Sequence, residues 1–137
     1  MADVNIRVEK VGGRECAFSG ATWEDKVGYA RAVRSGDFIL VSGTVGTNAD
    51  GTFPSSLSDQ TRRAFEIIQA AIEALGGKLE HVVRTRITMA DISKWSEVAV
   101  IHHELFASVR PASSIGASPA GIDGEVLVEI EVDAHVA

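Results

Sequence analysis

The sequence has little of several features that mark specialised classes of protein. Cys16 is the only cysteine in 137 residues, which excludes an internal disulfide and suits a reducing compartment. No apolar run approaches the roughly 18 residues that a membrane helix needs. The first ten residues, MADVNIRVEK, lack the apolar core of a signal peptide. We therefore expect a cytoplasmic protein with no membrane partner.

Basic residues are also scarce relative to acidic ones. The chain has 13 Lys and Arg against 19 Asp and Glu, a formal net charge of −6, and no basic run, so nucleic acid is not an expected partner. Apolar residues at 45% and charged residues at 23% are ordinary for a globular protein. We expect one domain over residues 1–137, with an N-terminal arm at 1–26 and a core at 28–136.

The stretch at 110–136 predicts a short strand, a turn and a long strand. The long strand alternates, and successive side chains of a strand project to opposite faces. One face carries apolar residues: Val126, Val128, Ile130, Val132, Ala134 and Val136. The other face carries Leu127, Glu129, Glu131, Asp133 and His135. Helices can bury the apolar face, whereas the carboxylates need cations, water or another subunit.

The rest of the chain predicts a simple order of elements. A short strand around residues 4–9 is broken by Gly12-Gly13, and Phe18 and Trp23 are candidate anchors for the arm, which either packs on the domain or covers a pocket as a lid. The pattern at 29–43 predicts a hairpin that turns at residues 35–37, with its second strand central in the sheet. A further strand is predicted at 82–90, with Val83, Thr85, Ile87 and Met89 sharing one face.

Two helices are predicted between these strands. The first is capped by Ser58 or Asp59 and ends at Gly76-Gly77; its apolar stripe leaves Gln60 to one side. The second runs from about Lys94 to Ala107 with Ser93 as its N-cap. His102 lies on its apolar face, where we expect a core histidine with one hydrogen bond. His102 and His103 are adjacent, not four residues apart, so no metal site is expected.

Together these elements predict an α+β fold with an approximately six-stranded mixed sheet and two helices on one face. The other sheet face remains bare and carries five charged residues: Arg84, Arg86, Glu129, Glu131 and Asp133. We expect other copies of the same chain to cover that face, with opposite charges pairing across neighbouring strands.

Four motifs in this order carry a family resemblance: GYARAVRSGDFILVSGT, HVVRTRITMADI, RPASS and LVEIEVDA. They resemble the reactive intermediate deaminase, or YjgF-like, family over about residues 28–134. The resemblance implies a chorismate-mutase-like fold and a homotrimer whose three sheets form a central barrel. It also implies small-molecule clefts between subunits. The best-studied members hydrolyse reactive enamines and imines, such as 2-aminoacrylate, without a cofactor or metal.

The resemblance also implies site residues. Tyr29 matches the family tyrosine of the first hairpin strand, Ser42 matches the serine of its Ser-Gly pair, and Glu129 matches the glutamate that positions water. The family motif Pro-Ala-Arg-Ser, whose arginine holds a substrate carboxylate, stands here as Pro111-Ala112-Ser113-Ser114. Ile115 replaces a cysteine but keeps a backbone that can bond a ligand.

The serine at position 113 removes a bidentate, charge-assisted contact to a carboxylate. Three other arginines are candidates to replace it: Arg31 first, then Arg110 and Arg86. Each can equally be in a structural ion pair or in solvent, and Arg31 can pair with Glu129. Glu129 itself has two interpretations, as the group that orients an attacking water or as a structural partner of an arginine.

Two functions fit this pattern. One is a cofactor-free hydrolase of enamines, imines or related small metabolites, diverged from 2-aminoacrylate deamination. The other is a trimeric module that binds a small ligand, or protects proteins, without chemistry. Retention of Tyr29, Ser42 and Glu129 favours the enzyme, and Ser113 favours the binding module.

Overall fold

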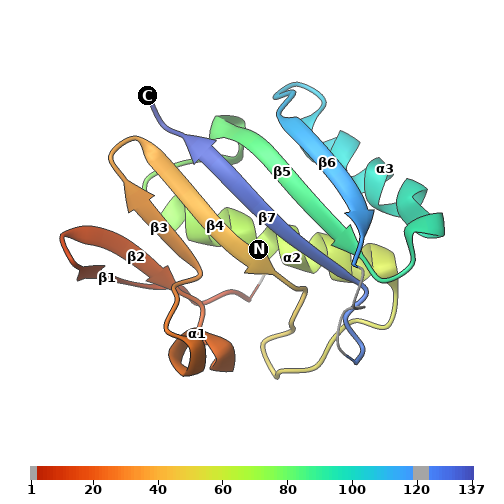
Figure 1. Ribbon diagram of the computed structural model, residues 1–137, viewed down its shortest axis with the longest axis horizontal. Coiled ribbons are helices and arrows are strands. Elements are labelled where there is room, and N and C mark those ends of the chain that lie inside the picture. The colour runs from red at the N-terminus through yellow and green to blue at the C-terminus, as the bar shows by residue number, and fades with distance from the viewer. Residues whose placement is uncertain (1–2, 119–123) are drawn as a thin grey trace.

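The computed structural model describes residues 3–118 and 124–137 and shows one twisted sheet with helices packed on it (Figure 1). The strands and helices follow in this order: β1 (Arg7–Val11), β2 (Arg14–Phe18), α1 (Thr22–Val27), β3 (Ala32–Ser35), β4 (Phe38–Thr44), α2 (Leu57–Ala74), β5 (Val82–Met89), α3 (Trp95–Phe106), β6 (Ala112–Ala117) and β7 (Val128–His135). Short 3-10 turns, η1 (Leu79–His81) and η2 (Ile92–Lys94), precede β5 and α3. The sheet order is β1-β2-β3-β4-β7-β5-β6, and only β5 and β6 pair in parallel.

The alternation predicted for the last strand is confirmed. β7 lies between β4 and β5, and its residues Val128, Ile130, Val132 and Ala134 are completely buried. They face α2, which carries its own apolar stripe of Ala64, Phe65, Ile68, Ala71 and Ile72. This layer is the core of the fold. The turn predicted between β6 and β7 falls in part on residues 119–123, outside the described residues.

The ends of α2 differ in detail from the sequence prediction. Ser56 is the N-cap, because its hydroxyl accepts the Asp59 N–H at 3.1 Å, so the predicted caps Ser58 and Asp59 are wrong by two or three residues. Gln60, expected beside the apolar stripe, is 1% exposed. Its side chain bonds the backbone of Pro54, Glu125 and Leu127, which ties the loop before α2 to the start of β7.

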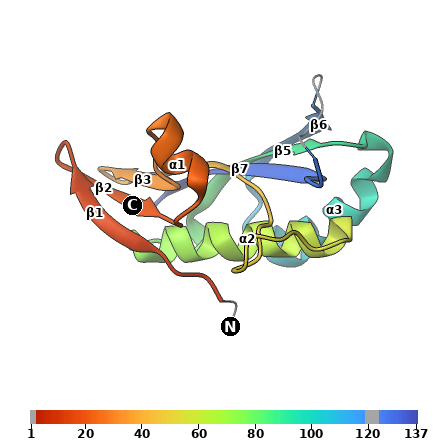
Figure 2. The same ribbon diagram turned by 90° about the horizontal axis from the view of Figure 1, so that it is seen from below.

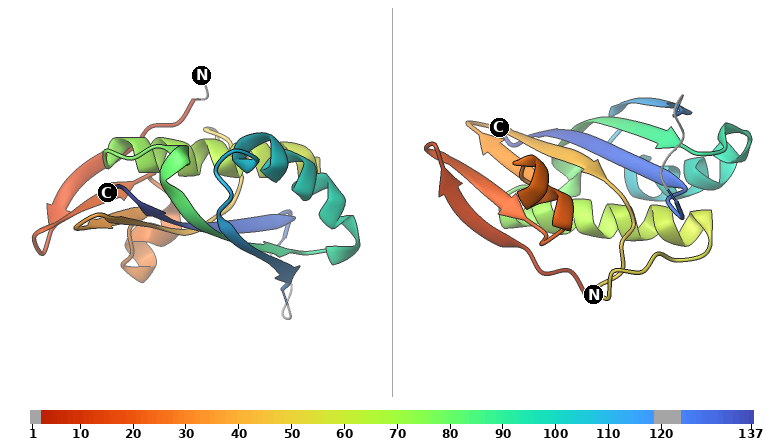
Figure 3. Two further views of the ribbon diagram at one scale, coloured as in Figure 1. Left: turned by 90° about the horizontal axis from the view of Figure 1, so that it is seen from above. Right: turned by 60° about the horizontal axis from the view of Figure 1, so that its bottom comes forward.

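The N-terminal region contains more regular structure than predicted. Residues 7–18 form a hairpin that adds β1 and β2 to the sheet, so the sheet has seven strands instead of about six. The six-residue helix α1 was not predicted, and it lies on the sheet face opposite α2 and α3 (Figures 2 and 3). Trp23, predicted as an anchor, is 63% exposed.

Two further predictions are corrected near β5 and α3. A register shift between Val82 and Arg84 turns Val83 out of the core, so Val83 is exposed instead of facing inward with Thr85 and Ile87. Ser93 is not the cap of α3. Asp91 accepts the Ser93 N–H at 3.0 Å and caps the preceding 3-10 turn η2.

Candidate functional site

Arg31 lies in a closed polar cluster just before β3. Its side chain is 6% exposed, and its Nε donates to the Glu24 carboxylate at 3.0 Å. Its Nη1 donates to the Gly43 carbonyl at 2.7 Å and to the Thr44 hydroxyl at 3.2 Å. The charge partner of Arg31 is therefore Glu24 on α1, which sequence reasoning missed, and no hydrogen bond or ion pair joins Arg31 to Glu129 within the described chain.

The Glu24 carboxylate also accepts hydrogen bonds from groups other than Arg31. The side chain is 2% exposed and also accepts the Ser19 hydroxyl at 2.5 Å and the backbone N–H groups of Ser19 and Gly20. A buried carboxylate needs such partners, because burial removes its contact with water. The ion pair fixes the turn between β2 and β3, because it joins α1 to the end of β4.

Tyr29 and Ser42 lie next to this cluster. The Tyr29 hydroxyl accepts from Arg31 Nη2 at 3.4 Å, which agrees with the prediction that the two side chains share one side of the chain. The Ser42 hydroxyl donates to the Ala30 carbonyl at 2.7 Å. Both candidate residues are half-buried and are held by the backbone around β3 and β4.

The Glu129 carboxylate lies against Gly43. A Cβ at position 43 would come within 2.9 Å of the Glu129 Cδ, so only glycine leaves room for this placement. The pairing of β4 with β7 shifts between Val41 and Thr44, and such an irregularity re-aims the local side chains. Glu129 is exposed, and its side chain has no hydrogen bond or ion pair within residues 3–118 and 124–137.

The other carboxylates on this face of β7 are paired. Arg86 Nη1 contacts Glu131 at 2.8 Å and Asp133 at 3.4 Å, and Arg84 contacts Asp133 at 3.9 Å. This is the cross-strand pairing predicted for the charged face. Arg86 is therefore paired with two carboxylates of its own chain. Ser114 pairs with Arg86 in the register of β5 and β6 and is exposed.

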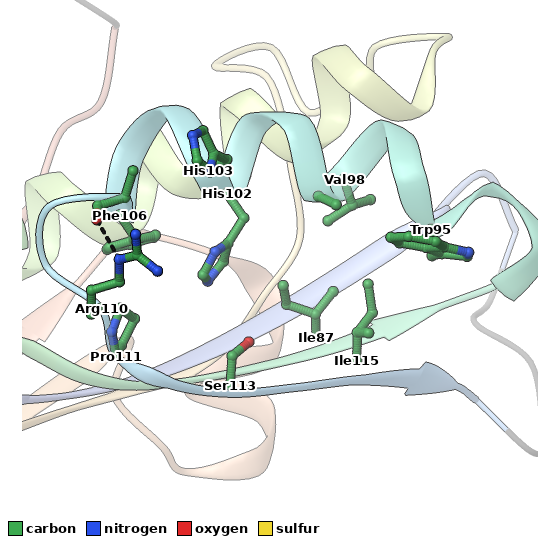
Figure 4. Close-up of a pocket in the computed structure, with 12 residues that line it drawn as sticks. Ile87, Trp95, Val98, His102, His103, Phe106, Arg110, Pro111, Ser113 and Ile115 are labelled. Carbon is green, nitrogen blue, oxygen red and sulfur yellow. Dashed lines mark hydrogen bonds between the residues drawn. The ribbon is translucent and has the colours of Figure 1, made fainter.

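Ser113 and Ile115 line a separate pocket between α3 and β6. The pocket has a volume of about 380 Å³ and is also lined by Ile87, Trp95, Val98, His102, Phe106 and Arg110 (Figure 4). Volumes of this order are typical of small-molecule sites. The predicted site residues are thus divided between two places: Tyr29, Arg31, Ser42 and Glu129 near the end of β4, and Arg110, Ser113 and Ile115 at β6.

A chain of three side chains crosses the floor of this pocket. Thr85 on β5 donates to the Ser113 hydroxyl at 2.8 Å and contacts His102 Nε2 on α3 at 2.9 Å. The expected single hydrogen bond of His102 is therefore the contact with Thr85. Burial against Phe65 and Phe106 lowers the pKa of the His102 imidazole, which favours its neutral form. Sequence reasoning missed Thr85 because it alternates like a core residue.

Arg110 stands at the end of the pocket nearest the C-terminus of α3 (Figure 4). It has φ of 60°, and it is the one non-glycine residue with positive φ in the described chain. Its Nε donates to the Ala107 carbonyl at 2.7 Å. No carboxylate pairs with its guanidinium within the described residues, in contrast to Arg31 and Arg86.

Within the described residues, 3–118 and 124–137, no three side chains of His, Cys, Asp or Glu come together as metal ligands. In the same residues, no helix has the length and apolar character to cross a membrane.

Comparisons with known proteins agree with this fold. Residues 22–136 match the family model described as Endoribonuclease L-PSP. The chain is similar to an uncharacterized protein of Streptomyces coelicolor, with 38% identity over 118 residues that cover 85% of this chain and 88% of the relative. A 2-iminobutanoate/2-iminopropanoate deaminase of Dermatophagoides farinae is 29% identical over 106 residues, covering 75% and 81% of the two chains.

A solved structure is also similar over nearly the whole chain. The crystal structure of Rv2704 from Mycobacterium tuberculosis, a member of the highly conserved YjgF/YER057c/UK114 family, matches with a TM-score of 0.82 and 41% identity. The match covers 90% of this chain and 99% of that one. The resemblance seen in the sequence motifs is therefore confirmed at the level of family and fold.

Proposed function

Because the chain belongs to the Endoribonuclease L-PSP family, which includes the YjgF-like proteins, we propose that it hydrolyses small enamines or imines without a cofactor. Water adds to the carbon of the C=N bond, the C–N bond then breaks, and the nitrogen leaves as ammonia with its added protons. The product is the corresponding oxo compound. The similar deaminase of Dermatophagoides farinae supports this class of reaction.

One observation carries this proposal: Glu129 is the unpaired carboxylate on a face where Glu131 and Asp133 both have arginine partners. A carboxylate without a structural partner in the described chain is free to accept a hydrogen bond from an attacking water. Gly43 makes room for it, and Tyr29 and Ser42 lie on the adjoining strands. These features favour the catalytic interpretation of Glu129 over the structural one.

We propose further that the site is completed between the subunits of a homotrimer. Ser113 faces α3, whereas Glu129 lies on the opposite face of the sheet and two strands away, so one chain cannot bring them together. Strand β6 is an edge strand, and the charged face also exposes Phe38, Leu40 and Val83. Unpaired edges and exposed apolar side chains favour association. Sedimentation equilibrium showing a stable monomer at micromolar concentration would overturn this assembly.

The test of the activity is ammonia release from imino acids generated in situ by an amino-acid oxidase. We expect turnover by the natural protein and its loss in Glu129→Gln, with Glu131→Gln as the matched control on the same strand. Turnover unchanged in Glu129→Gln would exclude the proposed role. Gly43→Ala is expected to lower turnover as well, because the added methyl group displaces the Glu129 carboxylate.

We expect 2-aminoacrylate itself to be a poor substrate. Loss of a bidentate arginine contact to a carboxylate costs on the order of 2–5 kcal/mol, or roughly 30- to 5,000-fold in rate. Ser113 supplies one neutral hydroxyl at that position, and the Thr85 hydroxyl already donates to it. Turnover of 2-aminoacrylate equal to that of arginine-containing relatives would show that another residue has taken this role.

The second candidate function is a binding module without catalysis, and the serine at position 113 is the observation that favours it. The two functions separate cleanly: a module binds small ligands with a measurable Kd yet releases no ammonia from any imino acid tested. The enzyme shows both properties.

A further inference from the structure

The pocket between α3 and β6 is unusual for this chain because no acidic side chain lines it. The whole sequence has 19 Asp and Glu against 13 Lys and Arg, yet the charged and titratable groups around the pocket are Arg110, His102 and His103. Burial keeps His102 mainly neutral, so Arg110 supplies the fixed positive charge. An anion is therefore favoured at this end of the pocket.

The pocket changes in character along its length. Arg110 and Pro111 lie at one end, Ser113 and His102 in the middle, and Trp95 and Ile115 at the other end, with Ile87 and Val98 between (Figure 4). A cation, then a hydroxyl, then an apolar wall match a ligand that carries an anionic group, a polar atom and an apolar group in that order.

The backbone of Arg110 supports a role for its side chain. The residue occupies the left-handed region, with φ of 60°, as the chain leaves α3. Glycine or asparagine is the usual choice there, and other residues cost roughly 1–2 kcal/mol. Strained backbone conformations are often found at functional sites, so the strain at Arg110 suggests a function for its side chain.

Two carbonyl groups at the C-terminal end of α3 are hydrogen-bonded within the chain. The Phe106 carbonyl accepts the N–H groups of Val109 and Arg110 at 3.0 and 2.9 Å, and the Ala107 carbonyl accepts Arg110 Nε at 2.7 Å. These two carbonyls are therefore not open to a ligand. The two Nη groups of Arg110 make no hydrogen bond or ion pair in the described residues, which leaves a donor pair for a carboxylate.

We propose that this pocket binds a small carboxylate with a bulky apolar group, placing the carboxylate on Arg110 and the apolar group against Trp95, Val98 and Ile115. This inference rests on the proposed function, because it names the substrate class as hydrophobic 2-imino acids and the 2-oxo acids that they become. Ser113 accepts from Thr85 and keeps its own proton, which it donates to the oxo or imino group. Arg110 thus holds the carboxylate at a different place from the family arginine, and a ligand there also needs a bulky apolar group, which 2-aminoacrylate lacks, to fill the far end of the pocket.

Stable 2-oxo acids test the pocket without any need for turnover. We would titrate the full-length protein with 4-methyl-2-oxopentanoate, with pyruvate and with 4-methylpentan-2-one, which lacks the carboxylate, in a calorimeter. The branched oxo acid is expected to bind at least 10-fold more tightly than pyruvate, and the ketone more weakly than either. Equal binding of the ketone and the branched acid would overturn the carboxylate anchor.

Variants assign the two ends of the pocket. Arg110→Gln is expected to weaken the branched oxo acid on the order of 10- to 150-fold, as loss of a charge-assisted pair does. Trp95→Ala should weaken the branched acid and leave pyruvate unchanged. Arg84→Gln is the control, because Arg84 contacts Asp133 on the other face of the sheet. Unchanged affinity in Arg110→Gln would overturn the proposal.

Failure of this inference is distinguishable from failure of the proposed function. Ammonia release with no preference for bulky oxo acids keeps the enzyme and removes the pocket assignment. Binding that depends on Arg110 without ammonia release from any imino acid keeps the pocket as a ligand site and removes the hydrolase. A melting curve for each variant verifies that it is folded.

Discussion

Two arginines of this chain show how differently one side chain can be used. Arg31 is buried, pairs with Glu24 and donates to a backbone carbonyl and a hydroxyl. Arg110 is exposed at a pocket, adopts a strained backbone and has no carboxylate partner in the described chain. The first is a structural group whose donors are used, and the second has donors to spare for a ligand. Sequence reasoning ranked them in the opposite order.

The largest expected effect concerns the closed cluster. Arg31→Ala leaves the Glu24 carboxylate buried without its cation, and such a break costs on the order of 3–5 kcal/mol. For a domain of this size we expect the melting temperature to fall by roughly 10–20 °C. The measurement is thermal unfolding followed by circular dichroism, with Arg62→Ala in the exposed pair with Glu104 as the control.

A second variant identifies the partner. Glu24→Gln in the Arg31→Ala background removes the unpaired charge and should recover part of the lost stability, whereas Glu129→Gln should not. Rescue by Glu129→Gln, or a melting temperature within about 3 °C of the natural protein for Arg31→Ala, would contradict the assignment of Glu24.

The next prediction concerns the hydrogen bonds that Thr85 makes to Ser113 and His102 beneath the pocket. Thr85→Val keeps the shape of a completely buried side chain but removes the bonds to Ser113 and His102. We expect the free energy of unfolding to fall by about 1–3 kcal/mol, because His102 is left half-buried without its partner. Urea unfolding measures this, and Thr88→Val on the same strand is the control. Equal effects of the two variants would show that the hydrogen bonds of Thr85 to Ser113 and His102 do not stabilise the fold.

The sequence predicted the parts of the fold that repeat a pattern. Strand β7 and helix α2 were found because Val128, Ile130 and the stripe around Ile68 follow the strand and helix periods over many residues. α1 was missed because it has six residues, too few for its apolar residues to repeat at the helical spacing. The buried Gln60 was misplaced for a related reason, since its partners are backbone atoms of distant loops.

The sequence identified single residues of the site but not how they are arranged or paired. The motifs identified Tyr29, Ser42 and Glu129, but the pairing of Arg31 with Glu24 depends on how α1 folds back over the sheet. Arg110 has no periodic signal, because its importance comes from a positive φ and from the pocket that α3 and β6 enclose. Such three-dimensional contacts leave no trace in the spacing of residues.

A variant at Arg110 is expected to change stability only slightly while it abolishes ligand binding. Arg110→Gly relieves the left-handed conformation, a gain of roughly 1 kcal/mol that the lost bond to Ala107 partly offsets. We expect the melting temperature to stay the same or rise by a few degrees while affinity for 4-methyl-2-oxopentanoate is lost. A fall of more than about 5 °C would show that the Arg110 side chain is structural, like Arg31.

The smallest effect is a dependence of stability on pH at His102. Burial lowers its pKa below the ordinary 6.5, so as pH falls below 6.5 the unfolded chain takes up the proton more readily than the folded one. Stability from this group is complete above pH 6.5 and declines until the pH passes the folded pKa. Because His102 is only partly buried, we expect a change of only a few degrees.

The measurement is the difference in melting temperature between pH 7.5 and pH 5.5. His102→Gln keeps a donor for Thr85 and removes the titration, so its difference should be smaller than that of the natural protein. His103→Gln, at the exposed neighbouring position, serves as the control. An identical difference in His102→Gln and the natural protein would show that the pocket floor is open enough to water for the imidazole to titrate normally. His102 would then be in contact with water, as Arg110 is, and not closed off from it as Arg31 is.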